Sequence, residues 1–470
     1  MEDYFATPHA KQQHQRMPCR SAAMAAGATT RPPTTTTSTT TTTTPLPENP
    51  LPFPGITLGV AKYQKIWARG AAADARPQYV EALVSPTTGH AYIKIRDIHP
   101  AHTKPLYLCS ELAVDDDDVD GGLTYVPTAR GEVVIKASRL TVQESEMVAS
   151  GRACMPRRRG ADEPLEEVKA MRQLSKDDSG AAAGVVPLLD SFVCADKWLY
   201  LVQPFYAHGD LVEVLAQGMP RQEAAVGAVS TPSPSREDWV QIIFMQLLGS
   251  LSHLKNRGVA HLDLSPENVF VEGDGTTVAL GDLGMALFVG PRVVASSIGA
   301  PPPAAAAAAP AGAFTFLPCT PPKPTLVASG AGELEPSSTF MRPHHPSAAS
   351  VLLTPQRFRG KLAYAAPEVL DEVPFDPYKV DIFSLGCTLF SILTGRLFLE
   401  PSSAKKGPRP RYSALLANDF ATLFHLDEQA MPLPSLAADL IQGMTQADPR
   451  ARLSLEEVME HRWVLDAERP

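Results

Sequence analysis

Two tracts of low-complexity sequence divide this chain and limit which parts of it can fold. The first contains a threonine run over residues 34–44 that is broken once by serine and followed by several prolines. The second covers residues 291–353 and is rich in alanine, proline, serine and threonine. Such tracts bury too little apolar surface to offset the conformational entropy that folding removes. We therefore predict a disordered tail over 1–54 and a disordered insertion over 291–353.

The composition narrows the classes of protein that remain. Hydrophobic residues make up 44% of the 470 residues, which is enough for a packed core. The chain has 42 basic and 51 acidic residues, and a net charge of −9 argues against a dedicated nucleic-acid binder. No run of 18 apolar residues occurs and the start of the chain lacks a signal pattern, so we expect no membrane span and an intracellular location, cytoplasmic or nuclear.

Strand-like segments come first in the foldable part, and helix-like segments follow. Runs of β-branched and aromatic residues predict strands at Ala91–Ile98, Leu106–Leu112, Glu132–Ala137, Val185–Val193 and Trp198–Pro204. Apolar residues at helical spacing predict helices at Pro164–Leu174, Glu237–Leu254, Val380–Leu393, Ala437–Met444 and Leu455–His461. This order predicts an α+β fold with a small β-rich lobe ahead of a larger helical lobe.

The segment with the most chemical information reads HLDLSPEN and runs from His261 to Asn268. Fourteen residues later the chain reads DLG, beginning at Asp282. Phosphoryl transfer from ATP needs a carboxylate to orient the acceptor hydroxyl, and an amide and a carboxylate to hold magnesium. Asp263, Asn268 and Asp282 supply these groups in that order. The two segments resemble the catalytic loop and the magnesium-binding tripeptide of eukaryotic protein kinases of the Ser/Thr type.

Three later positions extend this resemblance in the same order. Ala366-Pro367-Glu368 closes the segment that begins at Asp282, and Asp381 begins a helix that in the family holds the catalytic loop. Arg452 stands where the family keeps the ion-pair partner of Glu368. These matches imply structural roles for Glu368, Asp381 and Arg452 and catalytic roles for the earlier motifs.

The resemblance also implies where the domain lies. We expect a two-lobed protein-kinase-like fold over residues 90–464, with the small lobe at about 90–203 and the large lobe at about 207–464. A second disordered insertion is predicted at about 217–235, where Thr-Pro and Ser-Pro pairs gather. Residues 55–89 are interpreted as an N-terminal extension with no assigned structure.

A nucleotide site follows from the same resemblance. Lys136 matches the lysine that holds the α- and β-phosphates in the family, and Glu167 matches the glutamate that pairs with that lysine. Lys94 is a rival for the same role. It lies 73 residues before Glu167, whereas Lys136 lies 31 residues before it, and the shorter connection is favoured.

Residues 198–206 resemble the strand and linker on which adenine packs. On this register the backbone of Pro204 and Tyr206 would bond the adenine edge, and Gln203 would border the pocket behind it. Asp210, which follows a glycine, would reach the ribose. Proline is compatible with position 204 because that position contributes its carbonyl oxygen.

Three departures from the family pattern bear on activity. No G-x-G-x-x-G can be written between Arg76 and Lys136, so the glycine loop is degenerate and nucleotide binding should be weakened. Leu262 replaces the arginine that meets a phosphorylated residue of the activation segment in the family. Leucine carries no charge, so we expect no regulation by phosphorylation through this position. Ser265 replaces a lysine that contacts the transferred phosphate. Lys361 either restores that charge from the other side of the cleft or is a solvated surface lysine.

The resemblance thus implies a divergent protein Ser/Thr kinase with ATP and Mg²⁺ as cofactors and a protein as substrate. Asp263, Lys136 and Lys361 are the expected catalytic groups, and Asn268 and Asp282 are the expected metal ligands. The alternative is a pseudokinase, a scaffold or binding module with weak or no phosphoryl transfer. The sequence specifies neither the identity of the protein substrate nor the oligomeric state.

Overall fold

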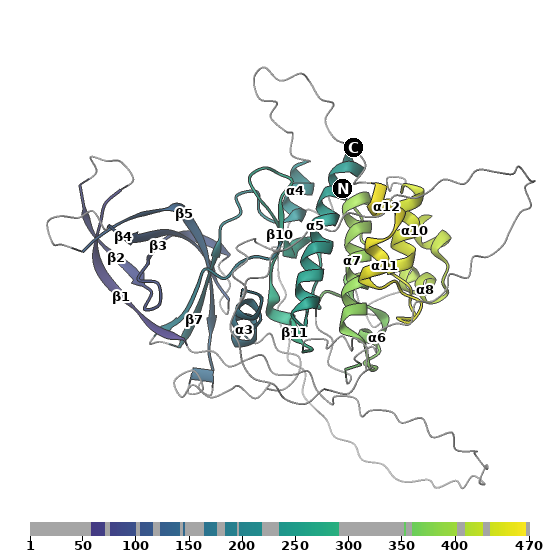
Figure 1. The fold of residues 1–470 in the computed structure, drawn as a ribbon, viewed down its shortest axis with the longest axis horizontal. Helices are drawn as coiled ribbons and strands as arrows, with labels where there is room; N and C mark the ends of the chain where they lie inside the picture. Colours follow the sequence, from purple (N-terminus) through teal and green to yellow (C-terminus); the bar gives the residue numbers. More distant parts are fainter. Residues whose placement is uncertain are drawn as a thin grey trace, which may run out of the picture. The chain divides into compact units, whose positions relative to one another are not determined.

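Seven strands in the N-terminal part of the chain form one closed barrel (Figure 1). Its order around the sheet is β1-β2-β3-β4-β5-β7-β6, and β1 closes it by parallel pairing with β6 and with the start of β5. The strands are β1 (Gly59–Ala68), β2 (Gln78–Val84), β3 (Ala91–His99), β4 (Leu106–Val114), β5 (Thr124–Arg139), β6 (Asp190–Cys194) and β7 (Trp198–Pro204).

The computed structural model describes most of the chain from residue 58 to residue 466. The described ranges are 58–70, 76–99, 104–115, 123–141, 144–145, 164–175, 184–194, 197–218, 235–290, 352–353, 360–401, 409–425 and 433–466. The predicted tail 1–54 and nearly all of the two predicted insertions lie outside these ranges, so those three expectations remain predictions.

The expectation that the small lobe begins near residue 90 is wrong. Strands β1 and β2, which lie in the segment interpreted as an extension, pair with each other from Ala68 and Gln78 to Lys62 and Val84 and belong to the barrel. The sequence pattern hides β1 because most of its side chains are exposed and only Ala61 and Ile66 are buried. A strand with so few inward-facing apolar residues lacks the alternation by which strands are recognised.

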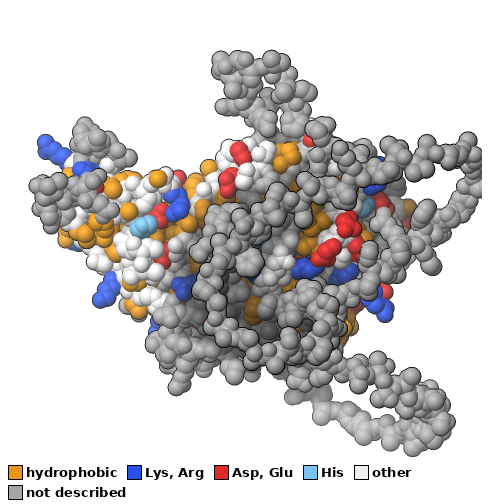
Figure 2. All heavy atoms as spheres, viewed as in Figure 1, with side chains coloured by type: hydrophobic (Ala, Val, Ile, Leu, Met, Phe, Trp, Pro, Cys, Tyr) orange, Lys and Arg blue, Asp and Glu red, His pale blue; other side chains and the backbone are white. Residues whose placement is uncertain are grey.

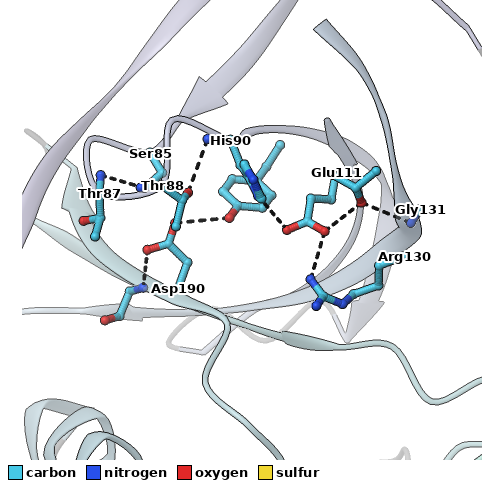
Figure 3. Close-up of polar contacts among 11 residues, drawn as sticks. Ser85, Thr87, Thr88, His90, Glu111, Arg130, Gly131 and Asp190 are labelled. Atoms are coloured by element: carbon cyan, nitrogen blue, oxygen red, sulfur yellow. Dashed lines mark hydrogen bonds and ion pairs between the residues drawn. The ribbon is translucent and has the colours of Figure 1, made fainter. Parts of the chain in front are cut away.

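A buried polar network joins the β2–β3 turn to three other strands (Figure 3). Asp190 at the start of β6 accepts hydrogen bonds from the Thr88 hydroxyl at 2.9 Å and from the Tyr92 hydroxyl at 3.1 Å. Glu111, at a register shift between β4 and β5, is 2% exposed and contacts His90 and Arg130, each at 3.0 Å. Because each buried carboxylate has several partners, the network fixes the turn against the barrel.

The C-terminal part of the chain is mainly helical (Figure 1). Its elements surround α5 and α7, two long helices that pack on each other, and a small hairpin of β9 with β10. The helices are α4 (Leu211–Gln217), α5 (Arg236–Asn256), α6 (Pro367–Leu370), α7 (Pro377–Thr394), α8 (Pro410–Leu416), α9 (Phe420–His425), α10 (Ser435–Met444), α11 (Leu455–Met459) and α12 (Arg462–Leu465). The short strands are β8 (Val259–Ala260), β9 (Val269–Val271), β10 (Val278–Leu280) and β11 (Leu287–Phe288).

Helix boundaries follow from capping chemistry. Ser235 Oγ accepts a hydrogen bond from the backbone N–H of Asp238. The backbone N–H of Ser235 in turn donates to Asp238 Oδ2, and the two bonds form a capping box at the start of α5. Ser454 and Glu457 form the same arrangement at the start of α11. The helix predicted over 455–461 ends at Met459 as α11, and His461 instead accepts a hydrogen bond from the backbone N–H of Trp463 and caps α12, which begins at Arg462.

One predicted strand is shorter than expected. The pattern predicted a strand over 185–193, but the strand itself is β6, which begins at Asp190. Pro187 interrupts the segment since proline has no N–H to donate to a sheet. Val185 instead forms an isolated parallel bridge with Leu280, and the backbone N–H of Val186 donates to the Leu280 carbonyl at 2.9 Å.

Helix α3 (Pro164–Leu174) links the barrel to the helical part. Its buried residues Leu165, Val168 and Met171 share a hydrophobic cluster with Leu199 of β7 and with Leu283, which follows β10. This cluster is separate from the barrel core and from the large core around α5 and α7. The contact brings α3, β7 and the chain after β10 together, and β7 in turn pairs with β5.

The surface shown in Figure 2 carries basic and acidic side chains interspersed among apolar ones. Among the described residues, the exposed large apolar side chains include Tyr63 and Trp67 of β1 and Tyr79 of β2. The rings of Trp67 and Tyr79 are 5.2 Å apart, so part of their apolar surface is covered by mutual contact. Within the described ranges, every helix is either too short or too polar to span a membrane.

Candidate active site

Three charged side chains from distant parts of the sequence meet beside α3. The ammonium group of Lys136 on β5 lies 2.8 Å from Glu167 Oε1 on α3 and 3.0 Å from Asp282 Oδ1. The Glu167 side chain is 2% exposed, whereas that of Asp282 is 43% exposed. Lys136 therefore joins a carboxylate sealed in the interior to one that is partly exposed.

The electrostatics of this cluster keep the Asp282 carboxylate ionised. Burial alone would raise the pKa of Asp282, but the charge and hydrogen bond of Lys136 outweigh it and lower that pKa to about 2. Burial likewise lowers the pKa of Lys136, and the two carboxylates overcome this and raise it. Burial raises the pKa of Glu167 despite its lysine partner. At neutral pH Asp282 is thus an anion open to a cation.

The segment that carries Asp263 is held by a buried aspartate. Asp381 on α7 accepts hydrogen bonds from the backbone N–H groups of His261 at 2.8 Å and Leu262 at 2.7 Å. Leu262 has a φ of 63°, a left-handed conformation that is strained for a branched side chain, so these two bonds stabilise an otherwise unfavourable turn. The predicted role of Asp381 in fixing this loop is confirmed by this contact.

The loop residues converge on Asp263 and Asp282. Asn268 donates from Nδ2 to the Asp263 carbonyl oxygen at 2.6 Å and to Asp263 Oδ2 at 3.1 Å. The backbone N–H of Gly281 donates to the Asn268 carbonyl oxygen at 2.8 Å, which places Asp282 next to the same loop. Burial raises the pKa of Asp263, while the positive charge of Lys361 opposes that shift.

Lys361 lies beside Ser265, the residue that replaces a lysine of the family pattern. Its ammonium group donates to Ser265 Oγ at 2.6 Å and lies 3.6 Å from Glu267 Oε2. The Lys361 side chain is 36% exposed, so it is neither buried nor simply solvated. A cation on a different segment thus occupies the neighbourhood of the serine that replaces the family lysine.

Gly360 is a functional position that sequence reasoning did not identify. Its φ is +90°, and a Cβ placed there would lie 2.9 Å from Asp263 Oδ1 and 3.0 Å from the Leu262 carbonyl oxygen. Only glycine allows the backbone before Lys361 to approach Asp263 so closely. A glycine directly before the displaced lysine was the available signal for this contact.

The end of β7 and the segment after it contain the three residues expected to contact the nucleoside. Pro204 ends β7 opposite Val133 of β5, and the Tyr206 ring stacks on Phe270 with ring centroids 5.5 Å apart. Asp210 caps α4 by accepting from the backbone N–H of Glu213 at 2.9 Å, and burial raises its pKa to about 6. The capping bond uses Oδ1, so a ribose contact would need Oδ2.

The rival lysine lies elsewhere. Lys94 on β3 pairs with Asp97 at 2.9 Å, and its side chain is 51% exposed. Its ammonium group also lies 4.4 Å from the centre of the Tyr107 ring. The geometry therefore favours Lys136 over Lys94 as the lysine beside Glu167.

A buried ion pair supports the end of the segment that carries Lys361. Arg452 binds Glu368 through two parallel bonds of 2.7 and 3.0 Å, and both side chains are buried. This pair matches the partnership expected from the sequence. It anchors α6 directly after Lys361 and thereby fixes the backbone on that side of the cleft.

A family profile for the protein kinase domain matches residues 134–302 and 340–464. The chain belongs to the eukaryotic protein kinase family. Its match covers β5 from Val134 to the end of α12 and is interrupted only within the predicted insertion over 291–353. Strands β1 to β4 precede the matched region, which begins two residues before Lys136.

The kinase has relatives of low identity among characterised proteins. It is 25% identical over 231 residues to sperm motility kinase 2B of Mus musculus, which is 49% of this chain and 33% of that protein. It is 24% identical over 280 residues to testis-specific serine/threonine-protein kinase 1 of Mus musculus, covering 60% and 55% respectively. Serine/threonine-protein kinase chk1 of Schizosaccharomyces pombe is 24% identical over 272 residues, covering 57% and 38%. The chain thus spans between a third and about half of the length of these relatives.

Proposed function

We propose that this chain is an ATP-dependent protein serine/threonine kinase that transfers the γ-phosphate of Mg-ATP to a hydroxyl group of a protein substrate. The contact of Lys136 with both Glu167 and Asp282, beside the loop that holds Asp263, is the observation that carries this proposal. The names of the relatives support serine and threonine as acceptors. In this proposal Lys136 binds the α- and β-phosphates, and Glu167 holds the lysine in place.

The donor atoms present fit a magnesium ion that is shared with a nucleotide. Asp282 receives bonds from Lys136 and from the backbone of Gly284 at Oδ1, and neither contact uses Oδ2. Asn268 donates both of its described bonds from Nδ2, so its amide oxygen can face a cation. Among the described residues no cluster of three or more His, Cys, Asp or Glu side chains is suited to a metal. Mg²⁺ usually takes one or two protein oxygens together with phosphates and water, which agrees with this pair.

When bound, magnesium would neutralise charge on the phosphate oxygens. The protein's own groups then orient the acceptor. Asp263 accepts a hydrogen bond from the substrate hydroxyl and receives its proton as the hydroxyl oxygen bonds to the γ-phosphorus, while the bond from that phosphorus to the β,γ-bridging oxygen breaks and ADP leaves. Lys361, held at Ser265, supplies positive charge on the acceptor side of Asp263. Pro204 and Tyr206 border the adenine, and Asp210 contacts the ribose.

A pseudokinase scaffold is the second candidate, and one observation favours it. The residues between Arg76 and Lys136 contain no G-x-G-x-x-G, so close approach of backbone N–H groups to the phosphates is restricted. In a scaffold, however, the cluster of Lys136, Glu167 and Asp282 would serve only to stabilise the fold. We therefore prefer the enzyme.

The two candidates separate in a transfer assay. We expect the purified chain, incubated with Mg²⁺ and γ-labelled ATP, to label peptides that carry serine or threonine and to leave matched alanine and tyrosine peptides unlabelled. A degenerate peptide library avoids the need to know the natural substrate. The absence of label in every peptide and in the chain itself, under conditions where Mg-ATP binds, would leave only the scaffold.

A further inference from the structure

The beginning of β4 lies directly beside the phosphate-binding lysine. Leu106, the first residue of β4, pairs with Lys136 of β5 across the sheet. The carbonyl oxygen of Pro105 accepts a hydrogen bond from the backbone N–H of Ala137 at 3.0 Å. Lys104 precedes these two residues, so the chain enters the sheet with a lysine at the edge next to Lys136.

Alternation along the strand places these side chains on one face. Cross-strand partners point to the same side of a sheet, and residues two apart along a strand do so as well. Leu106 shares a face with its partner Lys136, and Lys104 stands two residues before Leu106. The opposite face carries Ile135 and Ala137, which are buried in the barrel core. Lys104 precedes the strand, and the same alternation continued by two residues would place it on the face of Leu106 and Lys136, away from the core.

The charges of the cleft act on Lys104. Burial lowers the pKa of Lys104, the positive charge of Lys136 lowers it further, and the charges of Glu167 and Asp282 raise it. Coulombic effects of this kind fall with distance and are screened by water, which agrees with the place of Lys104 next to the strand pair of Leu106 and Lys136. The half-buried side chain thus adds a second cation to the cluster of Lys136, Glu167 and Asp282.

A second ammonium group beside Lys136 suits a polyanionic ligand. Like charges placed close together repel, and a phosphate group that contacts both ammonium groups would relieve that repulsion. A lysine has a flexible four-carbon stem and can reach a phosphate from a backbone that cannot come close. The segment before β4 lacks the glycines that would let backbone N–H groups make that approach.

We propose that Lys104 binds a phosphate group of the nucleotide and replaces the contacts that a glycine loop would make. The assignment rests on the proposed function, since it requires a nucleoside di- or triphosphate in the cleft. It predicts that nucleotide affinity depends on two lysines on neighbouring strands, Lys104 and Lys136. In this assignment Lys104 contacts the phosphate part of the ligand and not its nucleoside part.

Binding of nucleotide and nucleoside to the full chain tests the assignment. We expect Lys104→Met to weaken binding of Mg-ATP and Mg-ADP by about tenfold or more in calorimetric titrations, because a charge-assisted hydrogen bond is lost. Binding of adenosine should remain unchanged. Lys104→Arg should recover most of the affinity, and Lys94→Met serves as a matched control because that lysine is exposed and pairs with Asp97.

The outcomes separate this assignment from the proposed function. Equal Mg-ATP affinity of wild type and Lys104→Met would overturn the role of Lys104 and leave the kinase proposal intact. Equal weakening of adenosine and Mg-ATP would also overturn it, since the effect would then not concern phosphate. If the wild-type chain bound neither ligand, the proposed function would fall and this assignment with it.

Discussion

Replacing Asp263 by asparagine is expected to lower the turnover number for phosphoryl transfer by about 10²- to 10⁴-fold, the range associated with a general base. Asparagine has the shape of aspartate and can still accept the bond from Asn268, but it cannot receive the proton of the substrate hydroxyl. Mg-ATP affinity should be nearly unchanged, because the groups that bind phosphate and metal are different residues. Steady-state transfer assays and nucleotide titrations on the same preparation measure both quantities.

A matched carboxylate provides the control for this substitution. Asp371 is exposed at the end of α6, outside the loop that holds Asp263, and Asp371→Asn should retain full activity. Transfer by Asp263→Asn at the wild-type rate would show that this carboxylate does not handle the proton, and the proposed catalytic arrangement would be incorrect.

Replacing Lys361 by methionine is expected to reduce the turnover number at least about tenfold while Mg-ATP affinity stays almost the same. The ammonium group contacts Ser265, and its positive charge lowers the pKa of Asp263. Lys361→Arg keeps the positive charge and should recover part of the rate. Measurement of the turnover number and of the Michaelis constant for ATP separates the two effects.

The pH dependence of the same variant gives a second readout. Burial raises the pKa of Asp263, and Lys361 is the foremost charge that lowers it. Removal of that charge raises the pKa further, so the acidic limb of the rate profile should move to higher pH in Lys361→Met. The sign follows because the base must be ionised to accept a proton, and a higher pKa leaves it protonated over a wider acidic range. An unchanged rate and an unchanged acidic limb would reduce Lys361 to a surface lysine.

Much of the site was predictable because its chemistry lies in short, ordered motifs. The sequence placed Asp263, Asn268 and Asp282 in loops beside strands, and the structure brings those loops together through backbone bonds that join Gly281 to Asn268. The pairing of Lys136 with Glu167 was implied by the resemblance to the kinase family, and the shorter spacing favoured Lys136 over Lys94. Each of these features depends on a side chain whose chemical type is unusual at its position.

The parts that escaped prediction depend on long-range pairing. Strand β1 is mostly exposed, and its place in the barrel is set by pairing with β2 and β6, which its own residues do not reveal. Lys104 gains its position only because β4 pairs with β5 in the register that opposes Leu106 to Lys136. Gly360 is recognisable only once Asp263 is known to lie against it. Register and close approach are properties of the folded chain. A single lysine or glycine is too common in sequences to indicate either of them.

A thermal unfolding titration with Mg-ATP tests most directly whether the cluster of Lys136, Glu167 and Asp282 is a metal-nucleotide site. At a nucleotide concentration of about 100 times Kd, binding to the folded state should add about 2.7 kcal/mol to the free energy of unfolding. The account predicts a rise in Tm that depends on nucleotide concentration, requires Mg²⁺ and is lost in Asp282→Ala. A wild-type Tm that does not respond, or the same rise in Asp282→Ala, would contradict it.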